Sequence, residues 1–188
     1  MARWDPGTED RLREAALELF HRYGYEAVTI TQIAEHAGIT RRSYFRYFPD
    51  KREVLFAGSD QLPPYIAETV LAAPEHTPPL AAALQALAAA GAHLATHATQ
   101  PALRRAIIAT TPELQERERS KAAAITTALT EALHRRGTAP GKAAAIAHLT
   151  GLAFATAWTH WIDADGAEPF PACLDAAITT LREALCTD

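Results

Sequence analysis

Residues 28–52, VTITQIAEHAGITRRSYFRYFPDKR, contain the local signals that decide the fold. Thr29 and the glutamine three residues later form a capping-box pattern at the start of a short apolar helix. Gly38 is placed to end that helix and to open a tight turn. Thr40 is placed to cap a further short helix, which Pro49 ends. The stretch therefore predicts two short helices separated by a tight turn.

The second of these short helices has two unlike sides. Tyr44 and Phe48 are four residues apart, so both are expected to point into a core. The residues expected on the other side are Arg41, Arg42, Phe45 and Arg46. A compact helical unit with an arginine-rich helix at one edge is typical of proteins that enter a DNA groove. The alternative is an ordinary solvated helix face, because most arginines in folded proteins are exposed.

Helices on either side of this stretch are predicted to complete the unit. The pattern predicts a helix over residues 6–23, with Asp5 as its N-cap and Gly24 at its end. A second capping box at residues 50–53 predicts a fourth helix that starts at once. The proline pair at residues 63–64 is then expected to break or kink that helix.

The composition of the chain favours an all-α fold. Its 188 residues are 48% hydrophobic, and alanine and leucine are abundant whereas strand-favouring residues are sparse. Beyond Leu71, proline and glycine separate further helical patterns. These helices are predicted at residues 79–98, 100–110, 112–136, 141–163 and 170–186.

Charge is distributed unevenly along the chain, which has a net charge of -4. Residues 1–58 contain nine basic and nine acidic side chains, whereas residues 59–188 contain nine and thirteen. Within residues 41–52, five basic side chains accompany Asp50 alone. Because an acidic body repels DNA, binding is expected to be confined to this one positive edge.

Several other classes of protein are disfavoured. The sequence has no Gly-rich phosphate loop, no Gly-x-Ser-x-Gly turn and no clustered metal ligands, so neither an enzyme nor a cofactor is expected. The alanine-rich stretch at 80–92 is interpreted as too short and too weakly hydrophobic to cross a bilayer. The first residues lack the order of a signal peptide, which predicts a cytoplasmic protein. In that setting Cys173 and Cys186 are expected to be ordinary helix residues.

Residues 8–56 resemble the DNA-binding domain of the TetR family of bacterial transcriptional regulators. The similarity lies in AALELF of the first helix, in GYEAVTITQIAEHAGIT and in RRSYFRYFPDKREVLF. Order, spacing and helix caps all agree over the first third of the chain. The resemblance implies a helix-turn-helix DNA-binding domain at residues 6–52, followed by a helical ligand-binding and dimerisation domain at residues 53–188.

The resemblance also implies which side chains contact DNA. Thr29 would hold a phosphate while it caps its helix, and Lys51 would take another phosphate. Arginines at the start of the recognition helix can grip guanine O6 and N7 bidentately. The implied DNA-contacting residues are Thr29, Thr40, Arg41, Arg42, Ser43, Phe45, Arg46, Tyr47 and Lys51.

The chain departs from the commonest family pattern at one point of this segment. The family usually has leucine followed by tyrosine where this chain has Tyr44-Phe45. Phe45 has no hydroxyl, so it cannot donate a hydrogen bond to a phosphate. It is expected to press against a thymine methyl group or a sugar instead.

For the rest of the chain, the resemblance implies a homodimer that presents two recognition helices to a pseudo-palindromic operator. The helices at 141–163 and 170–186 would pair with their copies in a four-helix bundle. Small side chains on one side of the first would allow close approach: Ala147, Gly151, Ala155 and Thr159. An apolar stripe on the second would be Ile178, Leu181 and Leu185.

The middle of the C-terminal domain is predicted to bind a hydrophobic or aromatic small molecule. The predicted lining residues are Leu87, His93, His97, Ile107, Ile125, Leu129, Phe154 and Trp158. Phe154, Trp158 and Trp161 form an aromatic stripe, for which a core or a subunit contact is favoured over the lining of a ligand pocket. His93 and His97 have a spacing that can bind zinc, but the sequence shows no third ligand, and a metal site is not expected.

The sequence thus predicts a ligand-responsive transcriptional repressor that a small hydrophobic molecule releases from its operator. Two alternatives remain. One is an activator with the same DNA-contacting segment, and the other is a small-molecule-binding helical protein that does not bind DNA.

Overall fold

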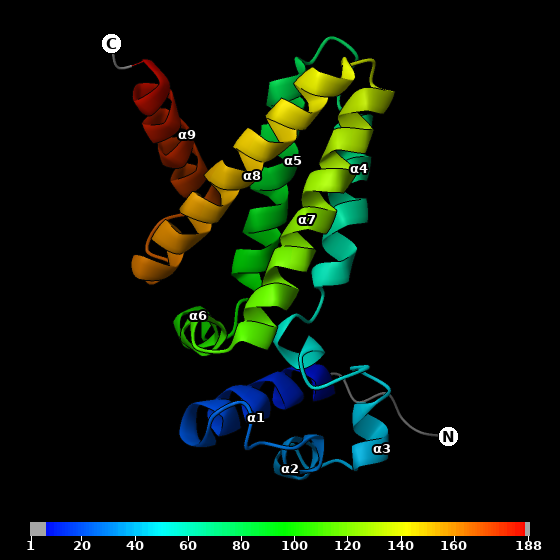
Figure 1. Cartoon of the computed structure of the whole chain (residues 1–188), viewed down its shortest axis with the longest axis vertical. Coiled ribbons are helices and arrows are strands. Elements are labelled where there is room, and N and C mark those ends of the chain that lie inside the picture. Colours follow the sequence, from blue (N-terminus) through cyan, green and yellow to red (C-terminus); the bar gives the residue numbers. More distant parts are fainter. Residues whose placement is uncertain (1–6, 187–188) are drawn as a thin grey trace. The chain divides into compact units, whose positions relative to one another are not determined.

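The computed structural model describes residues 7–186, and their side chains as far as residue 184. Every regular element within these residues is a helix, which confirms the predicted all-α fold (Figure 1). The α-helices are α1 Thr8–Tyr23, α2 Ile30–His36, α3 Arg41–Tyr44, α4 Leu62–Ala72, α5 Pro79–Thr96, α6 Pro101–Ala109, α7 Pro112–Arg135, α8 Pro140–Asp163 and α9 Phe170–Cys186. Two short 3₁₀ helices, η1 Glu53–Leu55 and η2 Ser59–Gln61, lie between α3 and α4.

The chain forms two compact units, and each is continuous in space but not in sequence. The N-terminal unit contains the residues up to Gly58 together with Thr99–Glu118. The C-terminal unit contains Ser59–Ala98 and the residues from Arg119 onward. This division differs from the predicted boundary between residues 52 and 53. The reason is that apolar side chains of η1 and α6 share one buried cluster with α1, α2 and α3.

The first helix buries one side and ends at a glycine, as predicted. Leu12 is fully buried and Phe20 is 2% exposed. The amide of Gly24, which has a φ of 80°, donates to the Phe20 carbonyl at 2.9 Å and closes the helix. The helix begins at Thr8. The predicted N-cap and first residue, Asp5-Pro6, lie outside the described residues.

The capping box at the start of α2 forms as predicted. The Gln32 amide donates to Thr29 Oγ1 at 3.3 Å, and the Thr29 amide donates to Gln32 Oε1 at 2.8 Å. Ile33 and Ala34 in the middle of α2 are fully buried. Gly38 then opens the turn with a φ of 74°, in the left-handed region that favours glycine.

The α-helical part of α3 is shorter than predicted. It ends at Tyr44, and the chain continues as turns in which the Arg46 and Tyr47 amides donate to carbonyls three residues earlier. The prediction of one α-helix as far as Pro49 is therefore wrong. Tighter turns at the end of a short helix are common, and they keep the next side chains on the same surface.

The predicted fourth helix is also wrong, although its cap forms. Asp50 Oδ1 accepts hydrogen bonds from the amides of Arg52 and Glu53 at 2.8 and 3.1 Å. Only one 3₁₀ turn follows this cap, and Gly58 redirects the chain with a φ of 75°. The proline pair at 63–64 then starts α4 instead of breaking a helix, since the first amides of a helix need no intrahelical partner.

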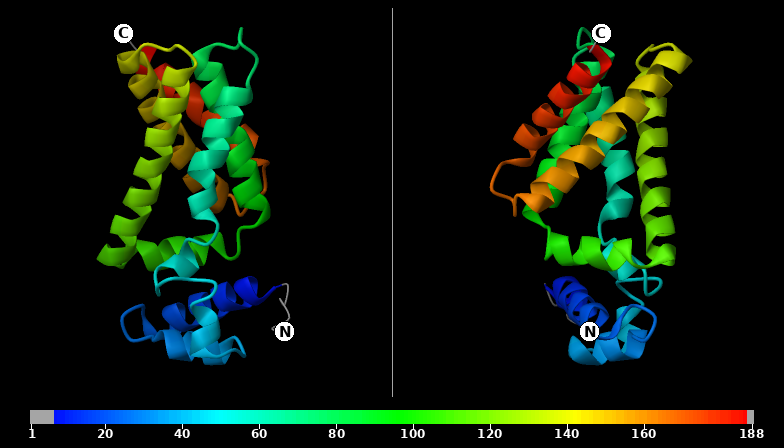
Figure 2. Two further views of the ribbon diagram at one scale, coloured as in Figure 1. Left: turned by 90° about the vertical axis from the view of Figure 1, so that its right-hand side faces the viewer. Right: turned by 60° about the vertical axis from the view of Figure 1, so that its left-hand side comes forward.

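The five predicted helices of the later chain are confirmed, and three of them, α5, α8 and α9, pack on one another. Helix α5 contacts α4, α8 and α9, which run beside it in the C-terminal unit (Figure 2). Alanines such as Ala83 and Ala86 are fully buried where these helices approach. A Cβ atom added to Gly91 of α5 would lie 2.0 Å from the Phe170 ring of α9. Gly91 therefore sets how closely these two helices pack.

Helix α5 bears on one expectation about membranes. With 18 residues and a mean hydropathy of 1.2, it is long and apolar enough to cross a membrane by length and composition alone. The alanine-rich stretch at 80–92, which is predicted to be too short and too weakly hydrophobic to cross a bilayer, is only part of this longer helix. Leu87 and Ala90 of α5 are nevertheless 1% exposed in the core of the C-terminal unit. A core helix meets the same criterion, because it is apolar on most of its sides.

Candidate nucleic-acid interface

Two buried aromatic rings fix α3 within the N-terminal unit. Tyr44 is fully buried and Phe48 is 3% exposed, as predicted, and their ring centroids are 5.6 Å apart. The Tyr44 hydroxyl donates to the Asp50 carbonyl at 3.0 Å. Burial, with a smaller contribution from the Asp50 charge, raises the pKa of Tyr44 above its ordinary value. A neutral hydroxyl therefore connects α3 to the segment that follows it.

The opposite side of α3 and of the turn after it is open to solvent, as predicted. Phe45 is 45% exposed, although it is a large apolar side chain. Ser43 and Tyr47 are half-buried. The exposed residues are Arg41, Arg42, Phe45 and Arg46.

The three arginines of this surface differ in how they are held. The Arg41 guanidinium lies over the Phe45 ring, 5.4 Å from its centroid, and Arg46 lies 5.8 Å from the centroid of Tyr47. Both are cation–π distances. Arg42 forms no hydrogen bond, ion pair or ring contact with any residue that the structure describes. Its guanidinium fork is therefore open to a bidentate partner.

The two threonines predicted to contact DNA, Thr29 and Thr40, are engaged as helix caps. Thr40 Oγ1 accepts a hydrogen bond from the Ser43 amide at 3.1 Å and lies 3.0 Å from Ser43 Oγ. The Thr29 hydroxyl donates to Gln32 Oε1 at 2.9 Å. Both threonines are exposed, so a phosphate contact would be added to their capping role.

Lys51 has a structural role that the sequence did not indicate. Its ammonium group donates to the carbonyls of Tyr25 and Val28 at 2.9 and 3.1 Å. It also lies 4.0 Å from the centroid of the Tyr25 ring. Two of the three ammonium donors are therefore used within the unit. The predicted phosphate contact of Lys51 stays a prediction, with one donor left to make it.

Charged side chains of α6 and α7 hold the segment that follows the recognition helix. Arg117 forms an ion pair with Glu53, which is 4% exposed. The Arg104 Nε donates to the Leu55 carbonyl at 2.6 Å, and its guanidinium lies 4.9 Å from the Phe56 ring centroid. Sequence analysis missed these supports because the partners are 64 and 49 residues apart.

Two family models match this chain. Residues 12–57 match the model described as bacterial regulatory proteins, tetR family, and residues 60–186 match the MftR C-terminal domain. The chain belongs to the TetR family. The resemblance found in residues 8–56 is thereby confirmed.

A curated relative of this TetR-family chain is the HTH-type transcriptional regulator TcmR of Streptomyces glaucescens. The two are 41% identical over 83 residues, which are 44% of this chain. The same match covers 35% of TcmR, so the chain spans about a third of that relative's length.

Solved structures agree with the TetR-family fold. The SmeT–triclosan complex is similar with a TM-score of 0.62 and 16% identity, over 93% of this chain and 91% of that one. FadR of Thermus thermophilus, in complex with lauroyl-CoA, is similar with a TM-score of 0.55 and 22% identity, over 96% of each chain. At these identities the likeness establishes the fold alone. It confirms an N-terminal helix-turn-helix domain followed by a helical C-terminal domain.

The structure brings together only some of the residues predicted to bind a small molecule. Leu87 and Leu129 are 1% exposed in the core of the C-terminal unit. Ile125, Phe154 and Trp158 pack against the same core. Ile107 is not with them, because it belongs to the core of the N-terminal unit.

The two predicted polar partners of this ligand, His93 and His97, are exposed near the end of α5. Their ring centroids are 4.5 Å apart, and His97 Nδ1 lies 2.9 Å from the His93 carbonyl. No group of three His, Cys, Asp or Glu side chains that could hold a metal ion occurs among the residues for which a structure is described.

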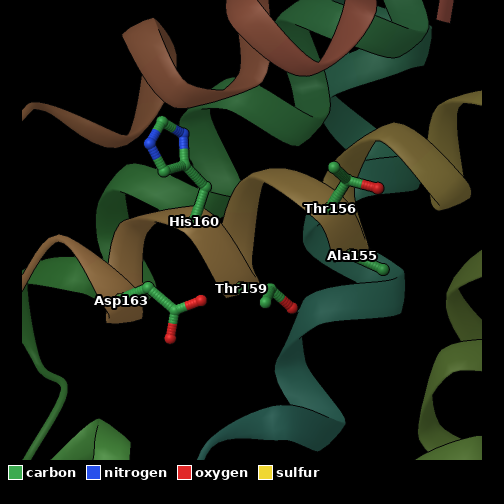
Figure 3. A pocket seen from close by; sticks show the side chains of 5 residues that line it. All are labelled: Ala155, Thr156, Thr159, His160 and Asp163. Carbon is green, nitrogen blue, oxygen red and sulfur yellow. The ribbon is translucent and has the colours of Figure 1, made fainter. Parts of the chain in front are cut away.

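Two surface depressions of the C-terminal unit are lined by none of the predicted ligand residues. One is an open depression along α8, and Figure 3 shows that all of its lining residues come from this helix. They are Ala155, Thr156, Thr159, His160 and Asp163. The other lies beside the starts of α5 and α8 and includes His76, Arg136 and Lys142.

The small-residue stripe predicted on α8 is not one exposed surface. Ala147 is fully buried, Gly151 is half-buried, and Ala155 and Thr159 are exposed. The stripe is split because Ala147 belongs to the buried core of the C-terminal unit. Leu149 and Leu152, which the sequence analysis did not single out, are 47% and 53% exposed instead.

The apolar stripe predicted on α9 faces the core of its own unit. Ile178 and Leu181 are half-buried and pack against that core. Cys173 is 1% exposed, and burial raises the pKa of its thiol. The side chains of Leu185 and Cys186 lie outside the described residues.

Proposed function

We propose that this TetR-family chain is a sequence-specific DNA-binding transcriptional regulator of the cytoplasm, and more finely a dimeric repressor that a hydrophobic small molecule releases from its operator. One observation carries the DNA-binding part. The side of α3 that faces away from the core presents Arg41, Arg42 and Arg46 together, while Tyr44 on the other side is fully buried. Such a helix can enter a groove without disturbing the unit that holds it.

The residues of this surface suit two different tasks. Some can contact phosphates and so position the protein, and others can recognise bases. Phosphate contacts fix the orientation of a protein on DNA, whereas contacts with base edges provide the specificity. Thr29, Thr40 and Tyr47 carry hydroxyls that can contact phosphates. Of the three arginines on this surface, Arg42 is the one without a ring contact, ion pair or hydrogen bond to a described residue. We therefore assign it to a base edge, with guanine as the favoured partner.

The exposed side of α8 supports the dimer. Leu149 and Leu152 are about half exposed on a helix whose other side is in the core. Apolar side chains in such a position suit an interface with a second copy, which would present two recognition helices to a pseudo-palindrome. A variant with Leu149→Glu and Leu152→Glu should sediment as a monomer while the wild-type chain sediments as a dimer.

Similar proteins support a hydrophobic effector. SmeT has been solved with triclosan and FadR with lauroyl-CoA. Triclosan and the lauroyl chain are apolar, although the CoA part of the second ligand is polar and charged. In this chain Phe154, Trp158 and Phe170 gather with ring centroids 5.1 to 6.3 Å apart. A ligand that enters between such rings must open the packed core, so it would favour a state with a different arrangement of helices. Titration with triclosan or lauroyl-CoA should then change the fluorescence of Trp158 and lower the affinity for DNA.

The DNA-binding part is tested by gel shift against the DNA upstream of the chain's own gene. Wild-type protein should bind specifically, with an affinity that falls steeply as salt increases. Arg42→Ala should weaken specific binding about 5- to 150-fold, the equivalent of roughly 1–3 kcal/mol, and leave non-specific binding unchanged. Equal binding by both proteins would refute the role of Arg42, and no binding to any duplex would refute the function.

The two alternatives make different predictions. An activator would bind the same DNA, but deletion of its gene would lower transcription from the operator instead of raising it. A helical protein that binds small molecules without DNA would bind triclosan or lauroyl-CoA and show no gel shift at low salt.

A further inference from the structure

Phe45 is an unexpected side chain on a polar surface. It is the one large hydrophobic residue between positions 28 and 52 that is exposed, and the structure describes all of these residues. Its neighbours on the outer side of α3 are arginines. Burial of this ring against an apolar group of a partner would be favourable, because it removes apolar area from water.

The ring is held in place before any partner arrives. It meets the buried Tyr44 ring edge-on, with centroids 5.7 Å apart and an interplanar angle of 82°. Tyr44 is itself fixed by full burial and by its hydrogen bond to the Asp50 carbonyl. The Arg41 guanidinium covers part of the Phe45 ring at 5.4 Å. Little side-chain entropy is therefore left to lose when Phe45 binds.

The position of Phe45 determines what it can meet on DNA. It lies four residues after Arg41 and directly after the last residue of α3, with the Arg41 guanidinium over its ring. The proposed DNA-binding function places this side of the unit against the major groove. Base edges in the major groove are polar with one exception, the 5-methyl group of thymine. An arginine and a ring that share one side can therefore contact a guanine and an adjacent thymine.

We propose that Phe45 is a specificity-determining residue that recognises the 5-methyl group of a thymine in each half-site. This inference rests on the proposed DNA-binding function. The methyl group lies against the exposed part of the ring, while Arg41 covers another part of it. A contact with a sugar would bury similar apolar area but would not depend on the base.

The test removes the methyl group and nothing else. A high-affinity duplex is first selected from random DNA with the wild-type chain. Each thymine is then replaced in turn, in both half-sites, by deoxyuracil, and binding is measured at one fixed salt concentration. We expect one position at which each lost methyl weakens binding about three- to five-fold, as the burial of one methyl group predicts.

Phe45 variants attribute that effect to the ring. Phe45→Ala should bind the thymine and deoxyuracil duplexes equally, and Phe45→Leu should retain part of the difference. Circular dichroism and melting of each variant show whether it is folded. Arg42→Ala is the matched control, because it should bind all duplexes more weakly but keep the same ratio between thymine and deoxyuracil.

The possible outcomes distinguish a failure of this inference from a failure of the proposed DNA-binding function. If wild-type protein binds the selected duplex and every deoxyuracil version equally, the inference is overturned and DNA binding stands. If Phe45→Ala keeps the full sensitivity to deoxyuracil, another residue contacts the methyl group and the inference is again overturned. If no duplex is selected at all, the proposed function fails and the inference fails with it.

Discussion

Arg117 of α7 and Glu53 of η1 are 64 residues apart in the chain and form an ion pair inside the N-terminal unit. The Glu53 side chain is 6% exposed, whereas that of Arg117 is 34% exposed. Glu53 begins η1, the 3₁₀ turn that Asp50 caps in the segment between α3 and α4. The pair therefore joins the DNA-contacting segment to the first turns of α7, far from it in sequence.

Arg117→Ala should strongly destabilise the N-terminal unit. It leaves the buried Glu53 carboxylate without its arginine, a loss that costs roughly 3–5 kcal/mol for buried pairs. The double variant Glu53→Met with Arg117→Met should be much less destabilised, since two apolar side chains can replace a buried pair. Urea unfolding of the full chain measures both. Equal destabilisation by the single and double variants would contradict this account of the pair.

Gly91→Ala should destabilise the C-terminal unit. The new Cβ would lie 2.0 Å from the Phe170 ring, so α5 and α9 must move apart or the ring must leave its place. Such overpacking costs roughly 1–3 kcal/mol. Gly141→Ala is the matched control, because a Cβ there meets no atom within 4 Å. It should stabilise by up to about 1 kcal/mol, as alanine favours helix more than glycine does. Thermal melting gives the melting temperature of each variant. Similar shifts of both melting temperatures in one direction would contradict the close contact between Gly91 and Phe170.

Stability should fall at alkaline pH, and Tyr44 should account for part of the loss. Burial raises the pKa of Tyr44 and of Tyr25 above the ordinary value. As pH rises past about 10, the unfolded chain releases the tyrosine proton before the folded chain does, so the folded state loses stability until the raised pKa is reached. Each such group contributes up to roughly 1.4 kcal/mol per pH unit.

Tyr44→Phe isolates this contribution. The variant should be less stable at neutral pH by roughly 0.5–1.5 kcal/mol, because the hydrogen bond to the Asp50 carbonyl is lost. Its stability should nevertheless decline less steeply between about pH 9.5 and 11.5 than that of the wild-type chain. Urea unfolding at several pH values in this range gives the slope of the unfolding free energy against pH for each protein. Equal slopes would show that Tyr44 does not cause the loss of stability.

Lys51→Met should lower both stability and DNA affinity. The substitution keeps the apolar stem but removes two hydrogen bonds to the carbonyls of Tyr25 and Val28. Hydrogen bonds to charged groups contribute roughly 1.5–3 kcal/mol, so melting should occur at a lower temperature. DNA binding should weaken alike for all sequences, with a flatter salt dependence, if the remaining donor meets a phosphate. Arg42→Ala should weaken DNA binding but leave the melting temperature unchanged. This control separates the loss of a DNA contact from the loss of stability.

Local signals predicted the helix-turn-helix segment well. The caps at Thr29 and Thr40, the turn at Gly38 and the buried side of α3 all follow from interactions within about four residues. The length of α3 and the missing fourth helix were not predicted. Capping patterns indicate where a helix can start, whereas the extent of a short helix depends on the packing around it.

The sequence by itself determined the all-α fold, the starts of the later helices and the side chains that α3 presents to solvent. Only the tertiary structure decided that Lys51 binds two carbonyls, that Glu53 pairs with Arg117 and that Ile107 lies in the N-terminal core. The physical reason is the range of the interactions. Helix caps and apolar periodicity act between neighbours in the chain, but ion pairs and core contacts depend on which distant segments fold against each other.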